Sequence, residues 1–310
     1  MTDAFRFGRA VVTAAALLLA ACAPSLAQGQ GGDGTRRFRS GVDAVQVTVT
    51  VRDARGRLVG DLTRSDFELA ENGIRQEITH FDQGRVPVSL GVALDVSQSM
   101  YGQRMADAQQ ALRRFLVELL DPSDEAFLVV FNHDPHLQSP WTLGPSRAYA
   151  RLEEVRPYGA TAIYDALGMA LPLFAARSHA RAALVLISDG SDTASDATPT
   201  DVRRQIRRSD AFVYAVGIDA VERRPINDRV NTRLLREITG ESGGYTEVIH
   251  DSLELAAATE RIAEELRHQY TLGYTPSAPP DGRYRRIRVR VAGGDYDVRA
   301  RRGYVASAGP

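Results

Sequence analysis

The sequence predicts an α/β protein: a doubly wound, mostly parallel sheet whose flanking segments together form a small antiparallel β module. Three observations lead to this prediction. In the middle of the chain, continuous apolar runs typical of strands buried on both faces alternate with helical periodicity. Before and after it, in residues 41–83 and 269–305, hydrophobic residues alternate one by one, as in half-buried antiparallel strands. Neither flank has enough strands for a core of its own, so we expect the two to pack together as one sandwich-like module.

The composition is that of an ordinary globular protein. The chain has 310 residues, 44% of them hydrophobic and 25% charged, with a formal net charge of −1. This excludes a wholly disordered or collagen-like chain, and the near-neutral charge gives no reason to expect nucleic acid as a partner. The single cysteine, Cys22, excludes a disulfide framework and multi-cysteine metal sites. All 38 basic residues are arginine, which excludes Schiff-base chemistry on lysine.

The first residues have the pattern of an export signal. Arg6 and Arg9 precede an apolar run at 10–21 that is too short to span a membrane comfortably. A small-x-small motif ending at Ala27 predicts a signal peptide of residues 1–27. Alternatively, Leu19-Ala20-Ala21-Cys22 resembles a bacterial lipobox, in which case the signal is 1–21 and Cys22 is lipidated. Both interpretations stay open, and residues 28–40 are predicted to be a flexible linker.

The first flank begins with valines at alternate positions, 45 to 51, which predict a strand over 42–52. Asn72-Gly73 is a strong hairpin signal between apolar segments at 67–69 and 74–81. After the central region, period-two segments at 270–274, 283–291 and 296–302 predict three more strands.

The central region, 86–268, is predicted to be one α/β domain. Strands are expected at 90–96, 126–131, 137–143 (at a sheet edge), 182–188 and 211–218. Helices are expected at 103–120, 163–176, 201–208, 232–239 and 253–268, the second with a kink or break at Pro172.

Oxygen-bearing side chains follow several of these strands. Asp95, Ser97 and Ser99 share the loop after the first strand, Thr161 precedes a helix, and Asp189, followed by Gly190, ends another strand. The carboxyl ends of parallel strands meet at one edge of the sheet, which is where ligands bind. An all-oxygen ligand set suits a hard cation, above all Mg²⁺, with Mn²⁺ and Ca²⁺ as alternatives.

These residues resemble the metal-ion-dependent adhesion site of von Willebrand factor type A domains. The resemblance implies that Ser97, Ser99 and Thr161 bind the metal directly, whereas Asp95 and Asp189 act mainly through water. Gly159-Ala160 before the threonine departs mildly from the commoner Gly-Gly. Together with the flanks, the domain resembles exported bacterial von Willebrand factor A-related proteins of the Acidobacteria type.

The function predicted from this resemblance is that of an exported, metal-dependent adhesion module, not an enzyme. Its expected partner is a protein that presents an Asp or Glu carboxylate, with membrane contact only through the N-terminal lipid. The expected location is the periplasm or outer membrane if Cys22 is lipidated, and otherwise outside the cell. The alternatives are a structural envelope protein whose metal site is not essential and, less favoured, a metal-dependent hydrolase.

Other polar residues are interpreted as structural. Asp165 and Asp192 are predicted to cap or support the site, and His133 and His136 to be solvated loop histidines. Three arginines at 286, 288 and 290 form a basic stripe, interpreted first as a solvated strand face and second as a contact for an anionic glycan or lipid headgroup.

Overall fold

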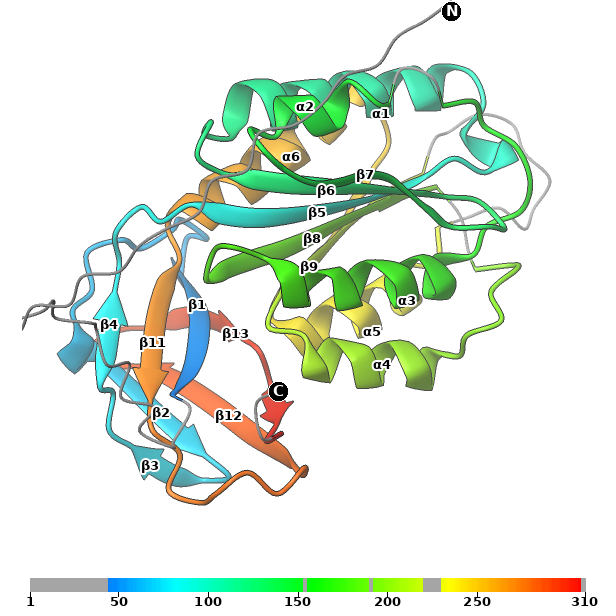
Figure 1. The fold of residues 1–310 in the computed structure, drawn as a ribbon. Helices are drawn as coiled ribbons and strands as arrows, with labels where there is room; N and C mark the ends of the chain where they lie inside the picture. Colours follow the sequence, from blue (N-terminus) through cyan, green and yellow to red (C-terminus); the bar gives the residue numbers. More distant parts are fainter. Residues whose placement is uncertain (1–43, 153–154, 190–191, 220–229, 308–310) are drawn as a thin grey trace, which may run out of the picture. The chain divides into compact units, whose positions relative to one another are not determined.

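A six-stranded sheet with the order β10-β9-β8-β5-β6-β7 forms the centre of the α/β region (Figure 1). Neighbouring strands are parallel, except that the edge strand β7 is antiparallel to β6. The strands are β5 (Val88–Asp95), β6 (Glu125–Phe131), β7 (His136–Leu143), β8 (Arg181–Ser188), β9 (Phe212–Ile218) and β10 (Thr246–Ile249). The structure is a computed structural model and describes residues 44–152, 155–189, 192–219 and 230–307.

Helices cover both faces of this sheet, which confirms the predicted doubly wound α/β fold (Figure 1). They are α1 (Gln103–Arg113), α2 (Ser146–Tyr149), α3 (Ile163–Leu173), α4 (Pro199–Arg208), α5 (Thr232–Ser242) and α6 (Ser252–Arg267). The core on one face includes residues of α1 and α6, and the core on the other includes residues of α3, α4 and α5. Among the described residues, no helix has the length and hydropathy needed to cross a membrane.

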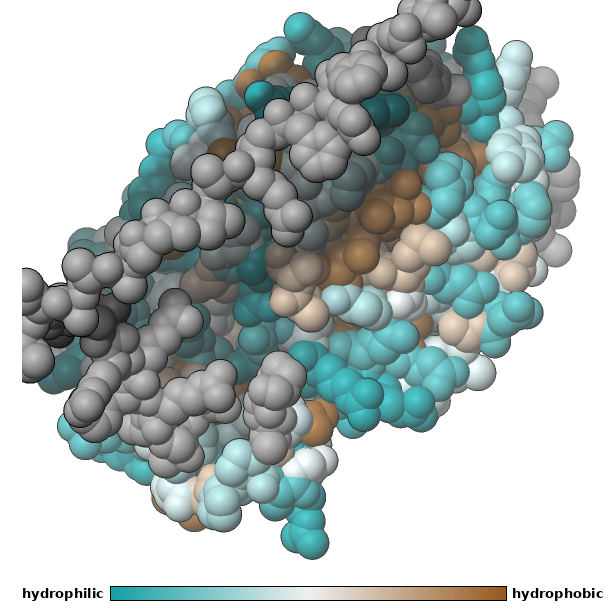
Figure 2. Space-filling view, in the orientation of Figure 1, coloured by the Kyte–Doolittle hydropathy of each residue, from teal (hydrophilic) through white to brown (hydrophobic). Residues whose placement is uncertain are grey.

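Helix α4 shows how the polar and apolar residues are divided. It buries Val202 and Ile206 in the core shared with α3 and α5, and its other positions are mostly polar, with four arginines among them. Figure 2 shows hydrophilic residues over the part of the surface where α4 lies. The helix is therefore held by one apolar face, as expected for a surface helix.

The flanking segments form two four-stranded antiparallel sheets, with the orders β13-β1-β11-β4 and β14-β12-β2-β3. From the first flank come β1 (Val45–Asp53), β2 (Phe67–Glu71), β3 (Ile74–Gln76) and β4 (His80–Asp82). From the second come β11 (Tyr270–Tyr274), β12 (Tyr284–Val291), β13 (Tyr296–Ala300) and β14 (Gly303–Val305). Each sheet takes strands from both flanks, and residues of both sheets share one hydrophobic core. The predicted β module of the two flanks is therefore confirmed.

Several details differ from the prediction. The segment 74–81 is not one strand but two, β3 and β4, which belong to different sheets. The short strands β10 and β14 and the one-turn helix α2 were not predicted, because three or four residues are too few to show a period. The helix predicted at 103–120 changes after α1 into wider π-type turns over Arg114–Leu119. The helix predicted at 163–176 ends at Leu173, next to Pro172, and finishes in a tighter 3₁₀ turn.

Candidate functional site

Strand β5 delivers Asp95 to the carboxyl edge of the sheet. All eight residues of the strand are buried, and Asp95 is its last residue. A short 3₁₀ turn at Gln98–Met100 follows, and Gly102, with a φ of 85°, leads into α1. Residues with a Cβ rarely adopt this backbone angle, so a glycine at this position permits the sharp turn into the helix. The loop between strand and helix carries Ser97 and Ser99.

Asp95 is a fully buried carboxylate with neutral hydrogen-bond donors. One oxygen accepts the backbone N–H of Ser97 at 2.8 Å, and the other accepts the Ser188 hydroxyl at 2.5 Å. Burial raises the pKa of Asp95 to about 6, although both serines act in the opposite direction by stabilising the charged form. A nearby cation would offset this cost of burying a negative charge.

Ser97, Ser99 and Asp189 form a continuous chain of hydrogen bonds. The two hydroxyl oxygens are 2.8 Å apart, and Ser99 donates to Oδ1 of Asp189 at 2.6 Å. Asp189 follows the last residue of β8, the strand next to β5. The structure thus brings together Asp95, Ser97, Ser99 and Asp189 at the ends of two neighbouring strands.

Thr161 lies in a loop that is tied to the same place through its backbone. Tyr158 donates its N–H to the carbonyl of Val96, and Gln98 donates to the carbonyl of Gly159, both at 2.9 Å. The N–H of Thr161 itself is held by the Thr193 hydroxyl at 3.1 Å. Within the described residues, no hydrogen bond joins the Thr161 side chain to the other four predicted ligands. The loop that carries Thr161, called the threonine loop below, is therefore adjacent to the loop that carries Ser97 and Ser99, called the serine loop. The Thr161 hydroxyl is an additional oxygen donor outside the hydrogen-bonded chain.

Arg104, on the first turn of α1, is a functional candidate that the sequence analysis missed. Its guanidinium donates to Oδ2 of Asp189 at 2.6 Å and to the carbonyl of Ser99 at 2.9 Å. Both side chains of this ion pair are buried, with exposed fractions of 7% for Arg104 and 0% for Asp189. Ser188 was missed as well, although a hydroxyl directly before Asp189 at a strand end is a signal that could have been used. No sequence signal identifies Arg104, because arginine at the start of a helix is common.

The oxygen donors of this site suit a hard cation. They are three hydroxyls and two carboxylates, and hydroxyl and carboxylate oxygens are what Mg²⁺ and related ions bind. The two carboxylates and one guanidinium leave one net negative charge among the side chains described above. Within the described part of the chain, no cluster of three or more His, Cys, Asp or Glu side chains offers another metal site. The donor set fits the predicted cation.

Two nearby carboxylates have structural roles. Asp192 accepts the N–H of Tyr164, in the first turn of α3, at 3.0 Å and the Ser195 hydroxyl at 2.5 Å. Asp165 accepts two backbone N–H groups at 2.8 and 2.9 Å, those of residues 197 and 196. This agrees with their interpretation as capping or supporting residues.

Both histidines are exposed, as expected. The ring of His133 packs against that of Tyr158, with 5.8 Å between the ring centroids, and therefore supports the threonine loop.

Cys22 and Gly190 lie outside the described residues.

The protein thus has a doubly wound α/β domain with a cluster of polar loops at the carboxyl edge of its sheet, the edge where sheets of this type commonly bind ligands. Comparison with known sequences shows what this region is similar to. Residues 90–191 match the sequence model of the von Willebrand factor type A domain.

Known proteins are similar to parts of this chain at low sequence identity. Inter-alpha-trypsin inhibitor heavy chain H2 of Mus musculus is 22% identical over 199 residues, which are 58% of this chain but only 20% of that protein. An aerotolerance-related membrane protein from Bacteroides fragilis, in a form with multiple mutations to serine, is 24% identical, with a TM-score of 0.50 over 58% of this chain and 98% of its own. A von Willebrand factor type A protein from Catenulispora acidiphila is 14% identical, with a TM-score of 0.50 over 87% of this chain and 76% of its own. These two structures show a common fold.

Proposed function

We propose that this protein is an exported, metal-dependent binding module. A von Willebrand factor type A domain is typical of protein-binding and adhesion proteins. In the proposal, Ser97, Ser99 and Thr161 hold a divalent cation directly, and Asp95 and Asp189 act through water. The observation that carries the proposal is the hydrogen-bonded set of Asp95, Ser97, Ser99 and Asp189 at the ends of two adjacent parallel strands.

The chemistry that the cation supplies is an open coordination position for an anionic oxygen. The three proposed direct ligands are neutral hydroxyls, which leave the charge of the cation largely unquenched. A carboxylate from an Asp or Glu of a protein partner would then be preferred over water. The chain's own part is to hold the hydroxyls in place through Asp189, the Ser188–Asp95 bond and the backbone of the threonine loop.

A binding function is favoured over a metal-dependent hydrolase because the other acidic side chains near the site already accept hydrogen bonds from the protein. Asp165 and Asp192 accept backbone N–H groups and a serine hydroxyl at 2.5 to 3.0 Å. A general base needs a lone pair directed at a reacting water. In these positions the two carboxylates instead fix the start of α3 and the loop after β8.

The metal site is tested first without any partner. Titration with Mn²⁺ or Mg²⁺, followed by calorimetry and by the melting temperature, should show saturable binding and stabilisation of the wild-type chain. Asp95→Ala should abolish binding while the far-UV circular dichroism is retained, and Thr161→Ala should weaken it by about 10–100-fold. Thr142→Ala, at a partly buried threonine of β7 whose hydroxyl donates to the carbonyl of Pro140, is the matched control and should bind as wild type does. Equal binding by Asp95→Ala and wild type would contradict the proposed site.

Partner binding is tested with the same variants. Proteins of the cell envelope that are retained on the immobilised chain in Mg²⁺ should be released by EDTA and should not bind Asp95→Ala. Replacing the acidic residue of an identified partner with its amide should have the same effect. Retention at full strength in EDTA and on Asp95→Ala would rule out the metal-bridged mechanism, even if the cation itself binds.

Export and anchoring are tested by fractionation. If Cys22 is lipidated, Cys22→Ser should move the protein from the membrane fraction to the soluble fraction, with cleavage shifted to Ala27. In a cell with two membranes, the outer one is the expected destination, because Ala23 and not an aspartate follows the cysteine. Unchanged fractionation of Cys22→Ser would favour signal peptide cleavage at Ala27.

A further inference from the structure

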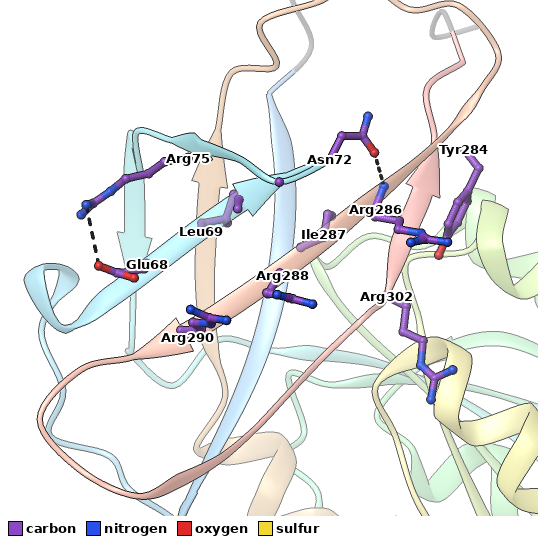
Figure 3. A pocket seen from close by; sticks show the side chains of 12 residues that line it. Glu68, Leu69, Asn72, Arg75, Tyr284, Arg286, Ile287, Arg288, Arg290 and Arg302 are labelled. Carbon is purple, nitrogen blue, oxygen red and sulfur yellow. Dashed lines mark hydrogen bonds and ion pairs between the residues drawn. The ribbon is translucent and has the colours of Figure 1, made fainter.

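Strand β12 of the β module presents three arginines on one exposed face. Arg286, Arg288 and Arg290 are exposed, and they alternate with Ile287, Val289 and Val291, which are buried or partly buried on the core side. Figure 3 shows the three arginines following one another along the strand. We call Arg286, Arg288 and Arg290 the arginine row. It lies on the module and not on the sheet that carries the proposed metal site.

The arginine row borders a hollow of about 860 Å³. Strand register explains the hollow, because Ala70 of β2 lies opposite Arg288 on one side and opposite Arg75 of β3 on the other. A small side chain between two long ones leaves space above the middle of the sheet. Tyr284 and Arg302 line the hollow as well (Figure 3). A volume of this size is much larger than one inorganic anion.

The hollow is strongly positive. Five arginines and one glutamate line it, and its ion pair is the exposed contact of 3.7 Å between Arg75 and Glu68. Within the described residues, no carboxylate pairs with the guanidinium groups of the arginine row. On the opposite side of the same strand, Arg285 is buried and paired with Glu71 at 3.3 Å. Like charges repel one another, so an unpaired row of this kind favours an anionic ligand.

The spacing of the arginine row indicates which anionic ligand fits. Alternate residues on a strand are about 7 Å apart, so three guanidinium groups extend over about 14 Å. An extended peptide carries its own alternate side chains at the same spacing. Guanidinium groups pair with carboxylates through two parallel hydrogen bonds. We propose that the arginine row binds an extended acidic protein segment with Asp or Glu at alternate positions.

A glycan is a weaker candidate for this hollow. Sugar rings commonly pack on exposed aromatic faces, and the aromatic side chain in the lining is Tyr284. One face of its ring already packs against the guanidinium of Arg207, 4.6 Å from the ring centroid. The arginine row does not depend on a metal ion, so this interaction is separate from the function proposed above.

The test uses the full chain and two labelled peptides of identical composition. In one, three glutamates alternate with serines; in the other, the three glutamates are consecutive. Fluorescence anisotropy in EDTA should show that the alternating peptide binds more tightly and that its affinity falls as salt rises. The triple variant Arg286→Gln, Arg288→Gln and Arg290→Gln should weaken this binding about tenfold, because each exposed pair contributes a few-fold. Arg288→Gln alone should have a smaller effect in the same direction.

The matched control removes three exposed arginines elsewhere, Arg147→Gln, Arg151→Gln and Arg156→Gln, and should bind the alternating peptide as wild type does. The proposal is overturned if the control and the arginine-row variant lose affinity equally, since only total charge would then matter. It is also overturned if both peptides bind alike. Anionic phospholipid vesicles and an acidic oligosaccharide are tested in parallel. If the vesicles or the oligosaccharide bind through the arginine row and the peptide does not, the proposed peptide partner is wrong and that ligand takes its place.

Discussion

Arg104 places a positive charge beside a carboxylate that the proposed cation site also needs. Its guanidinium holds one oxygen of Asp189, while Ser99 holds the other. Without a cation, this ion pair compensates the buried charge of Asp189. With a cation, the same guanidinium repels it over a short distance in a partly desolvated site. We therefore expect this side chain to stabilise the metal-free chain and to limit its affinity for metal.

Replacing Arg104 with glutamine should separate these two effects. Without metal, Arg104→Gln should destabilise the chain by about 3 kcal/mol, since a buried carboxylate loses the positive charge paired with it. Affinity for Mn²⁺ should rise about tenfold, and the increase in melting temperature at saturating Mn²⁺ should exceed that of wild type. Calorimetry and thermal melts with and without the ion measure both.

Arg104→Lys keeps the charge and is the control, with Mn²⁺ affinity expected near that of wild type. If Arg104→Gln instead binds Mn²⁺ more weakly, the main role of Arg104 is to orient Asp189 and not to oppose the cation. If neither wild type nor Arg104→Gln binds Mn²⁺, the proposed metal site itself is wrong.

At the scale of elements, the threonine loop depends on one glycine. Gly159 has a φ of +79°, and a Cβ at this position would lie 2.4 Å from Nδ1 of His133. The carbonyl of Gly159 also accepts the N–H of Gln98, which links this loop to the serine loop. In the pair Gly159-Ala160, which departs from the commoner Gly-Gly, the conformation of the loop therefore depends on Gly159 more than on the replaced position, Ala160.

Gly159→Ala should move the threonine loop and weaken Mn²⁺ binding about tenfold. It should also cost about 1–3 kcal/mol of stability, because a residue with a Cβ is held at a positive φ. Gly56→Ala is the matched control: Gly56 has a φ of +77°, but a Cβ there meets no atom within 4 Å. The control should lose some stability and keep its Mn²⁺ affinity. Equal Mn²⁺ affinities of the two variants would show that the threonine loop adjusts to the added methyl group.

The sequence was sufficient for elements with a clear period. The apolar runs that became β5, β6, β8 and β9 and the alternating valines of β1 predicted the layers and the β module. It was not sufficient for β10 and β14, whose three or four residues show no period, or for the break between β3 and β4. Asp95, Ser97, Ser99 and Asp189 could be predicted to lie together because they stand at or just after strand ends. Thr161 does not follow a strand, and its prediction rests on its place before a helix and on the family resemblance. Arg104 could not, because its role depends on how α1 packs against Asp189.

At the scale of the whole described chain, one buried carboxylate connects the β module to the α/β domain. Glu265 of α6 has no exposed side-chain surface and pairs with Arg52 of β1 at 2.9 Å and with Arg299 of β13. It also accepts the hydroxyl of Tyr214, in β9, at 3.0 Å. The module is therefore held to the domain by more than the chain connections at either end.

Removing this carboxylate should weaken the junction between the two parts. Glu265→Ala leaves Arg52 and Arg299 without their shared partner and should cost about 3–5 kcal/mol, as loss of one member of a buried ion pair does. Hydrogen exchange should then rise in β1 and β13, while the amides of β5 and β8 stay protected, because their core contains neither arginine. Glu260→Ala, whose pair with Arg114 is exposed, is the matched control and should cost less than about 1 kcal/mol. Exchange that rises equally in β1 and β5 of Glu265→Ala would mean that module and domain unfold as one cooperative unit, and that Glu265 stabilises the whole of it instead of joining two parts.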